Sequence, residues 1–364
     1  MNIIDPWKSV EVKDYGKLMK EFGISPIKDL YKKLPIKHHY FSRGIIFGHK
    51  DFSKILEAIK DKKPFVMMTG LMPSGKFHLG HKVVADIIIY LQKLGAECYV
   101  AVADIEATLT RDVKREEARK VALDQYLLNY IALGLKSKKT KFYFQSNGST
   151  EYNNLSKYVS KKTTFNEFKS VYGNLNPEKI ISAFTQVADI LHPQLKENGG
   201  PKPVIVPVGV DQLPHINLTR DIASRMKSEY NFVLPSSIFN KMLPGLQGGK
   251  MSSSRPESYI ALTDSPKTVE MKIKKYAFSG GQPTTKEHKE KGGNPDVDIS
   301  YQYLTFLEES DKKLKKIYDD YKSGKLLTSE LKQITIDKIN SFLKKHQDNR
   351  KKAKKKVNKF IFKN

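Results

Sequence analysis

The chain has 364 residues, which is enough for two domains and a substantial buried core. Its net charge of +25 indicates a polyanionic partner, although a lysine-rich genome would raise the charge without any function. No apolar run approaches the ~20 residues that span a bilayer, and the N-terminus lacks the basic and apolar regions of a signal peptide. The single cysteine, Cys98, excludes an internal disulfide framework and fits a reducing compartment. These features predict a cytoplasmic protein that does not cross a membrane.

Residues 1–63 are interpreted as an N-terminal lead-in without a catalytic pattern. The sequence predicts a helix near Tyr15–Phe22, a turn at Phe41–Gly44 and a short helix over Ser53–Lys60 that begins at a serine cap. Trp7, the only tryptophan, is expected to be a packing anchor.

Residues 64–262 alternate between predicted strands and helices. Apolar strands are expected at Phe65–Met68, Cys98–Ala103, Lys141–Phe144 and Val204–Val208, with helices at Lys82–Leu94 and Lys114–Leu133. Strands without polar alternation, separated by amphipathic helices, indicate a parallel sheet covered on both faces. The fold class is therefore α/β, with a Rossmann-like domain over residues 64–262 and a helical insertion near residues 153–200.

The stretch from Met68 to Lys82 combines a strand end, a Gly/Pro/Ser turn and a helix start. A helix N-terminus attracts anions, and Gly70, Gly75 and Gly80 would allow backbone and ligand to approach closely. His78 and His81 are three residues apart, so both imidazoles can reach one phosphate. A structural histidine pair is the alternative; a metal site is not expected, because no third ligand has zinc-type spacing. The motif predicts a nucleotide site.

A second motif, Gly248-Gly249-Lys250-Met251-Ser252-Ser253-Ser254, is rich in glycine and serine and carries one lysine. Such a loop suits a mobile arm that closes on a polyphosphate. A plain flexible linker has the same composition and is the alternative interpretation.

Polar residues follow several predicted strands, at the sheet edge where ligands bind in such folds. Glu106 is predicted to bind a substrate ammonium group, while the role of Asp104 is left open. Asp211 and Gln212 are expected to face ribose or an amino group. Gln186 and Asp189 share one face of an apolar helix, where a polar pair needs partners, either other side chains or a substrate.

Residues 263–364 change in character and predict a basic, all-α C-terminal domain. Helices are expected at Pro266–Tyr276, Val297–Leu307, Lys313–Tyr321 and Leu327–Lys345, with a charged loop at Gly280–Gly293. The tyrosines among them could stack on RNA, but most are interpreted as packing residues. The lysine-rich end, Lys344–Lys363, is predicted to contact RNA phosphates.

These motifs together resemble the tryptophanyl-tRNA synthetases, and more closely their archaeal and eukaryotic branch. His-Leu-Gly-His and Lys-Met-Ser-Ser-Ser are shared by class I aminoacyl-tRNA synthetases, whereas Ala277–Gly281 and Gly292–Leu307 are more specific to the tryptophan enzymes. The resemblance extends from near Trp7 to about His346. It implies ATP, L-tryptophan and tRNA(Trp) as substrates, Mg²⁺ held by phosphate oxygens and water, and a homodimer.

The resemblance also implies residue roles. Phosphate chemistry is assigned to His78, His81, Lys250, Ser252 and Ser253. ATP binding is assigned to Gly70, Ser74, Gly75, Gly80, Gly209, Asp211 and Met251. Tryptophan binding is assigned to Met68, Glu106, Gln186, Asp189 and Gln212.

The amino-acid pocket departs from the family pattern. Eukaryotic members have a tyrosine and a glutamine on the indole N–H, where this chain has Met68 and Ala101; bacterial members use an aspartate, which matches Asp189. A tyrosyl-tRNA synthetase is the nearest alternative, and Met68 argues against it, since such enzymes have a tyrosine there. A nucleotidyltransferase would lack the lysine loop and the basic helical domain. A non-catalytic RNA-binding homologue would not need intact His78, His81 and Lys250.

Overall fold

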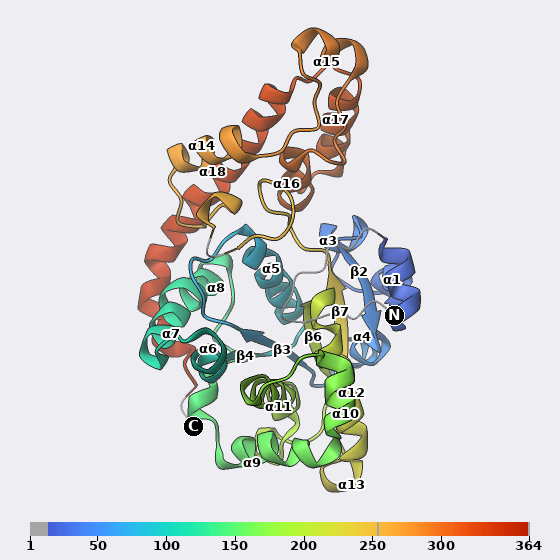
Figure 1. The fold of residues 1–364 in the computed structure, drawn as a ribbon, viewed down its shortest axis with the longest axis vertical. Helices are drawn as coiled ribbons and strands as arrows, with labels where there is room; N and C mark the ends of the chain where they lie inside the picture. Colours follow the sequence, from blue (N-terminus) through green and yellow to red (C-terminus); the bar gives the residue numbers. More distant parts are fainter. Residues whose placement is uncertain (1–13, 253–254, 363–364) are drawn as a thin grey trace. The chain divides into compact units, whose positions relative to one another are not determined.

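The computed structural model describes residues 14–252 and 255–362, so Trp7 and Ser253 lie outside the described residues. The chain forms two compact units (Figure 1). The first, which we call the sheet unit, consists of Met1–Ser74, Asp86–Lys241 and Lys355–Asn364. The second, the helical unit, consists of Gly75–Ala85 and Met242–Lys354.

The sheet unit is built on a seven-stranded sheet with the order β1-β2-β7-β6-β3-β4-β5. The strands are β1 Ser25–Pro26, β2 Ile46–Lys50, β3 Val66–Leu71, β4 Glu97–Val102, β5 Thr140–Phe144, β6 Val204–Gly209 and β7 Ser236–Asn240. The five strands from β7 to β5 are parallel, which confirms the predicted Rossmann-like core. β2 and β1 add antiparallel strands at the β7 edge, so the sheet is mixed and not wholly parallel as expected.

Helices of the sheet unit cover this sheet (Figure 1). One further helix, α5 Leu79–Lys93, spans the boundary between the units. The helices that lie wholly in the sheet unit are α1 Tyr15–Phe22, α2 Lys28–Tyr31, α3 His39–Ser42, α4 Phe52–Lys60, α6 Asp104–Arg111, α7 Arg115–Val121, α8 Leu128–Leu133, α9 Thr150–Tyr158, α10 Phe165–Tyr172, α11 Pro177–Leu191, α12 Leu213–Arg225 and α13 Lys227–Tyr230. The predicted helix Lys114–Leu133 is continuous but contains a π-helical segment, Ala122–Leu127, between α7 and α8.

Two local predictions in the lead-in need correction. The turn expected at Phe41–Gly44 is confirmed at Arg43 and Gly44, whereas Phe41 and Ser42 form the end of α3. The serine cap expected for Ser53–Lys60 is absent: α4 begins at Phe52, and Asp51 precedes it in a left-handed conformation without a side-chain cap.

One face of the sheet packs against α11 and α12. Its core consists of side chains from four strands together with Ile190 and Ile216: Val66, Met68, Tyr99, Ala101, Tyr143, Val204 and Val206. Each fully buried aliphatic or aromatic side chain of this kind contributes about 1.5–3 kcal/mol. Because α11 carries Asp189 next to Ile190, the same packing that closes the core also fixes this aspartate.

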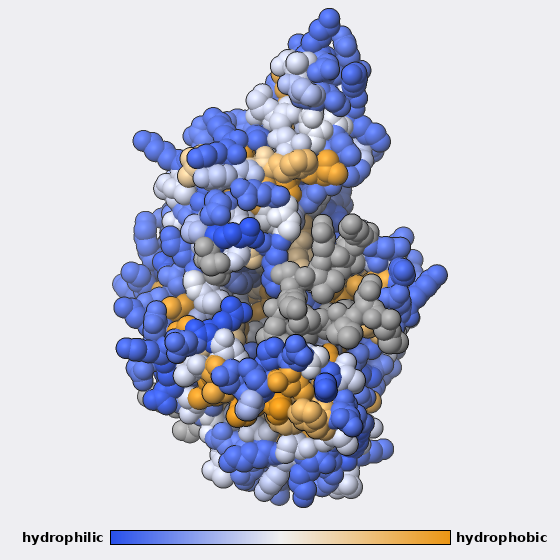
Figure 2. Space-filling view, viewed as in Figure 1, coloured by the Kyte–Doolittle hydropathy of each residue, from blue (hydrophilic) through white to orange (hydrophobic). Residues whose placement is uncertain are grey.

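The helical unit contains α14 Pro266–Tyr276, α15 Thr285–Lys291, α16 Ile299–Leu307, α17 Asp311–Lys322 and α18 Thr328–Ala353. The charged loop predicted at Gly280–Gly293 was wrong in part, since α15 forms within it behind a threonine cap, Thr284. Tyr301, Tyr303 and Tyr321 are buried, which confirms that they are packing residues. Within the described residues, no helix is long and apolar enough to cross a membrane, and hydrophilic residues cover most of the face in Figure 2.

The C-terminal end returns to the sheet unit and lies on the outer edge of β5. Ile361 forms a parallel bridge with Phe142. The N–H of Phe142 donates to the carbonyl of Phe360 (3.2 Å), and the N–H of Phe362 donates to the carbonyl of Phe142 (2.9 Å). Phe360 is buried, so part of the lysine-rich end packs against the edge of the sheet through this isolated bridge.

Candidate active site

His78 and His81 are held by backbone hydrogen bonds at the start of α5. The N–H of Gly80 donates to Nδ1 of His78 (3.1 Å), and the N–H of His78 donates to Nδ1 of His81 (3.2 Å). Because each Nδ1 accepts a hydrogen bond, the proton of each neutral ring is on Nε2. The helix begins at Leu79, so His78 precedes its first turn instead of lying within it as predicted.

Burial keeps both imidazoles neutral. It lowers the pKa of His78 to about 4, and burial together with the neighbouring His78 lowers the pKa of His81 well below its ordinary value. The rings stack with centroids 3.8 Å apart, so two positive charges would repel there. At neutral pH each ring therefore carries one N–H dipole and no charge.

The segment that follows the lysine loop, Ile260–Leu262, lies against the histidine motif within the helical unit. His78 forms an antiparallel bridge with Ala261, the N–H of Leu79 donates to the carbonyl of Ile260 (3.0 Å), and the N–H of Leu262 donates to Phe77 (2.9 Å). A Cβ on Gly80 would lie 3.0 Å from the His78 ring and 3.2 Å from the sulfur of Met251. The protein's own packing of the two motifs thus leaves little room for a side chain at this position.

The lysine loop has a defined backbone in its described part. Gly248 and Gly249 have φ values of 83° and 67°, which other residues rarely adopt. The hydroxyl of Ser258 accepts from the N–H of Ser252 (3.0 Å) and donates to the carbonyl of Arg255 (2.7 Å). Lys250 is exposed, whereas Met251 is buried.

A buried ion pair, missed by sequence reasoning, supports the segment that pairs with His78. Lys272 donates to Asp264 (2.8 Å) and to the carbonyl of Tyr259 (2.9 Å), while Asp264 accepts from the N–H of Ala261 (3.0 Å). Lys272 lies on α14 and Asp264 in the loop before it. The sequence of this basic helix does not indicate that one of its lysines is buried.

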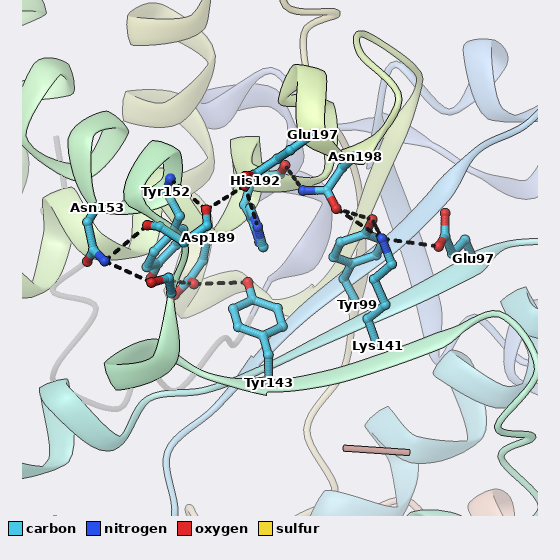
Figure 3. Close-up of polar contacts among 12 residues, drawn as sticks. Glu97, Tyr99, Lys141, Tyr143, Tyr152, Asn153, Asp189, His192, Glu197 and Asn198 are labelled. Atoms are coloured by element: carbon cyan, nitrogen blue, oxygen red, sulfur yellow. Dashed lines mark hydrogen bonds and ion pairs between the residues drawn. The ribbon is translucent and has the colours of Figure 1, made fainter. Parts of the chain in front are cut away.

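In the sheet unit, Asp189 lies at the centre of a buried hydrogen-bond network (Figure 3). One carboxylate oxygen accepts from the hydroxyls of Tyr143 (3.1 Å) and Tyr152 (2.9 Å), and the other accepts from Nε2 of Gln145 (2.7 Å). Oε1 of Gln145 in turn accepts from the N–H of Glu106 (3.4 Å). Gln145, which sequence reasoning missed, therefore connects two predicted tryptophan-binding residues.

Glu106 differs from Asp189 in its surroundings. Within the described residues, no group donates a hydrogen bond to its half-buried carboxylate. Burial, with a smaller effect from Asp189, raises the pKa of Glu106 to about 7. Burial also raises the pKa of Asp189 to about 6, although its three hydrogen bonds oppose this. Glu106 is thus the carboxylate with the greater free acceptor capacity.

The role of Asp104, left open from the sequence, is structural. Its side chain is fully buried, accepts hydrogen bonds from the N–H (3.1 Å) and hydroxyl of Ser146, and lies 3.5 Å from Arg119.

A second polar group joins Gln186, Gln212 and Asp211. Nε2 of Gln186 donates to Oε1 of Gln212 (3.4 Å), and Nε2 of Gln212 donates to Asp211 (3.4 Å). A Cβ on Gly209 would lie 2.5 Å from the Asp211 carboxylate, so glycine permits this close approach. Gln186 and Asp189, predicted to share one helix face, thus have different partners.

The remaining predicted residues follow β3 or lie in it. Met68 is buried in the core, and a Cβ on Gly70 would meet open space. The carbonyl of Ser74 accepts from the hydroxyl of Tyr126 (3.0 Å), and Gly75 adopts a left-handed conformation with φ 65°. In the described part of the chain, no three His, Cys, Asp or Glu side chains are placed to hold a metal ion.

Comparisons with known proteins agree with these motifs. Residues 60–344 match the model of the class I tRNA synthetases (W and Y). The tryptophan–tRNA ligase of Aeropyrum pernix is 46% identical, covering 96% of this chain and 95% of that protein. The tryptophan–tRNA ligase of Methanocaldococcus jannaschii is 44% identical, covering 96% of each.

Solved structures have the same fold. The crystal structure of the tryptophanyl-tRNA synthetase from Aeropyrum pernix K1 superposes with a TM-score of 0.92 and 45% identity over 99% of both chains. That of Plasmodium falciparum has a TM-score of 0.85 and 34% identity, covering 96% of this chain and 98% of its own. The chain therefore belongs to the class I tRNA synthetases of the tryptophan and tyrosine group.

Proposed function

We propose that this protein is a tryptophan–tRNA ligase. The observation that carries the proposal is the near-complete match to tryptophan–tRNA ligases, together with the presence of both signature motifs in one unit, where His78 pairs with Ala261 downstream of the lysine loop. In the proposed reaction, the tryptophan carboxylate attacks the α-phosphorus of ATP and pyrophosphate leaves. A hydroxyl of the terminal tRNA ribose then attacks the acyl carbon, and AMP leaves.

The phosphate-binding roles are proposed as follows. His78 and His81 donate from Nε2 to phosphate oxygens as neutral groups, and Lys250 supplies the positive charge that follows the leaving pyrophosphate. Ser252 and Ser253 add hydroxyl donors, while Gly70, Ser74, Gly75, Gly80, Gly209, Asp211 and Met251 contact the nucleotide. Mg²⁺ is proposed to enter with ATP, held by phosphate oxygens and water.

The amino-acid roles rest on Glu106, Gln186 and Gln212 for the ammonium group and on Asp189 and Met68 for the ring. The Glu106 carboxylate has no protein donor in the described chain and can therefore accept from an ammonium group. Asp189 already accepts three hydrogen bonds, and a carboxylate has about four acceptor positions, so one remains for the indole N–H.

We further propose, on resemblance to the family, that residues 263–364 form the tRNA-binding domain and that the enzyme works as a homodimer in the cytoplasm. The residues up to 63 are assigned as a lead-in and residues 64–262 as the activating domain.

ATP–pyrophosphate exchange, run separately with tryptophan and with tyrosine, tests the activity. We expect exchange with tryptophan and transfer to tRNA(Trp). Faster exchange with tyrosine would overturn the proposed specificity, and exchange with neither amino acid would overturn the activity. Light scattering tests the homodimer.

A further inference from the structure

The sheet unit contains a pocket, of about 420 Å³, that the proposed catalytic chemistry does not use. Its lining combines four lysines with an apolar floor and no acidic residue: Ile131, Leu135, Lys136, Ser137, Lys138, Lys356, Lys359 and Phe360. The lining comes from two distant segments, the end of α8 with the following loop and the C-terminal end of the chain (Figure 1).

The loop that presents Lys136 and Lys138 is fixed in place. Gln92 clamps it, because its Oε1 accepts from the N–H of Lys136 (2.9 Å) and its Nε2 donates to the carbonyl of the same residue (2.9 Å). The N–H of Thr140 closes a turn onto the carbonyl of Ser137 (3.0 Å). Lys139 has a φ of 63°, a conformation that non-glycine residues adopt at some cost. A rigid loop presents its charges with little loss of entropy on binding.

The other two lysines lie in a 3-10 helical turn, Lys354–Lys359, just before the bridge between Ile361 and Phe142. Phe360 is buried, and its carbonyl accepts from the N–H of Phe142 on β5 (3.2 Å). The N–H of Phe360 donates to the carbonyl of Val357 (3.0 Å), so the turn that carries Lys356 and Lys359 is tied to the sheet.

These four lysines differ from the surface lysines that form ion pairs with acids, such as Lys274 with Glu270 (2.5 Å) and Lys315 with Asp319 (2.7 Å). No acidic side chain of the described residues forms an ion pair with Lys136, Lys138, Lys356 or Lys359. Four ammonium groups around one hollow repel each other, and an anion that enters it relieves this repulsion.

We propose that this pocket binds the phosphate backbone of the tRNA substrate. It is a contact site separate from any that residues 263–354 of the helical unit provide. This rests on the proposed function, which supplies an RNA as the partner. RNA suits this pocket because its phosphates can pair with the lysine ammonium groups, while its ribose and base surfaces can cover the apolar side chains of Ile131, Leu135 and Phe360.

The test compares two variants that each replace four exposed lysines of the sheet unit with glutamine. The pocket variant is K136Q/K138Q/K356Q/K359Q, and the matched control, at four lysines that also form no ion pair in the described structure, is K17Q/K20Q/K33Q/K60Q. Both lose four positive charges from a net charge of +25, so a general effect of charge is equal in the two. The dissociation constant for a tRNA(Trp) transcript is measured between about 50 and 200 mM salt.

We expect the pocket variant to bind tRNA roughly 10–100-fold more weakly at the lower salt concentration, and its salt slope to fall by about 2–3. The control should change affinity less than about threefold. Lysine-to-arginine substitution at the four pocket positions should restore the slope, because it retains the charge. Equal slopes in the pocket and control variants would overturn the proposal.

Two further measurements separate the possible outcomes. Pyrophosphate exchange with tryptophan should be the same in wild type and in both variants; its absence in wild type would refute the proposed function without bearing on the tRNA affinities. Calorimetry with tripolyphosphate alone tests for a free-polyphosphate site. If the pocket variant loses tripolyphosphate binding but keeps wild-type tRNA affinity, the RNA assignment is wrong.

Discussion

At the scale of a single residue, Glu106 makes the proposed binding of tryptophan dependent on pH. Its pKa is raised to about 7, so in the free enzyme it is protonated below that pH and cannot attract an ammonium group. We expect the association constant for tryptophan to fall about tenfold per pH unit below pH 7, with a further loss as Asp189 titrates near pH 6. Calorimetric titration between pH 5 and 8 measures this.

The variant Glu106→Gln provides the control for this pH dependence. It should bind tryptophan more weakly at pH 8 and lose the fall near pH 7. A raised carboxyl pKa stabilises the folded state fully below the ordinary value of 4.5, and that stabilisation is lost as pH rises through 7. Wild type should therefore lose stability relative to Glu106→Gln over this range. A wild-type affinity that is flat from pH 5 to 8 would contradict the assignment.

Lys250 is the charged group predicted to follow the leaving pyrophosphate, because His78 and His81 are neutral at pH 7. Lys250→Ala should lower the rate of adenylate formation by roughly 10²–10³-fold with little change in tryptophan affinity. Pre-steady-state measurement of adenylate tests this, and Lys241→Ala serves as a lysine control outside the motif. A near wild-type rate would remove Lys250 from the mechanism.

Substitution of Asp189 tests how the enzyme selects tryptophan over other aromatic amino acids. If its remaining acceptor position receives the indole N–H, Asp189→Ala removes about 1.5–3 kcal/mol of charge-assisted hydrogen bonding. The preference for tryptophan over tyrosine or phenylalanine should then fall by roughly 10–150-fold in exchange assays. Tyr152→Phe removes one of its donors but keeps the carboxylate, so it should lose stability and keep its preference. Equal loss toward all three amino acids would make Asp189 a structural residue.

At the scale of elements, the buried Lys272–Asp264 pair connects α14 to the segment that pairs with His78. Lys272→Met leaves Asp264 buried without its cation, which should lower stability by about 3–5 kcal/mol and slow adenylate formation. Lys274→Met removes an exposed ion pair on the same helix and should cost less than about 0.5 kcal/mol. Urea denaturation of both variants compares them. Equal stability losses would mean that the buried pair contributes no more than the exposed one.

The elements predicted from sequence were those whose signal is local. Cys98–Ala103 and Val204–Val208 are apolar runs in buried parallel strands, and the structure has strands at nearly the same residues. β7 was missed because it begins with two serines after a proline, and its position depends on pairing with β6. α15 was missed because a short, highly charged segment has no apolar periodicity.

The same distinction applies to the candidate site. Both signature motifs are contiguous in sequence, so their pattern predicts a nucleotide site without knowledge of the fold. Gln145 and Lys272 were missed because their roles depend on partners 44 and 8 residues away that only the folded chain brings together. A glutamine after a strand or a lysine on a basic helix does not by itself indicate a buried hydrogen-bond partner.

At the scale of the whole molecule, the chain leaves the sheet unit, forms most of the helical unit and returns with its last residues. Phe360 and Phe362 thereby hydrogen-bond to Phe142 of β5. Nζ of Lys141, also on β5, lies 5.0 Å from the centroid of the Phe362 ring. The lysine-rich end therefore has a stabilising role in addition to any contact with RNA. Its deletion would remove both, so a deletion cannot by itself measure RNA binding.

Deletion of residues 355–364 should consequently destabilise the sheet unit more than the helical unit. The loss of two buried or half-buried phenylalanines and two backbone hydrogen bonds should cost about 3–6 kcal/mol. Hydrogen exchange should show faster exchange of the β4 and β5 amides, with α16 and α18 little changed. The variant K356Q/K359Q retains Phe360 and should keep wild-type exchange at β5. If the deletion leaves β5 as protected as in wild type, or α16 and α18 lose as much protection as β5, the C-terminal residues are not what stabilises this edge of the sheet.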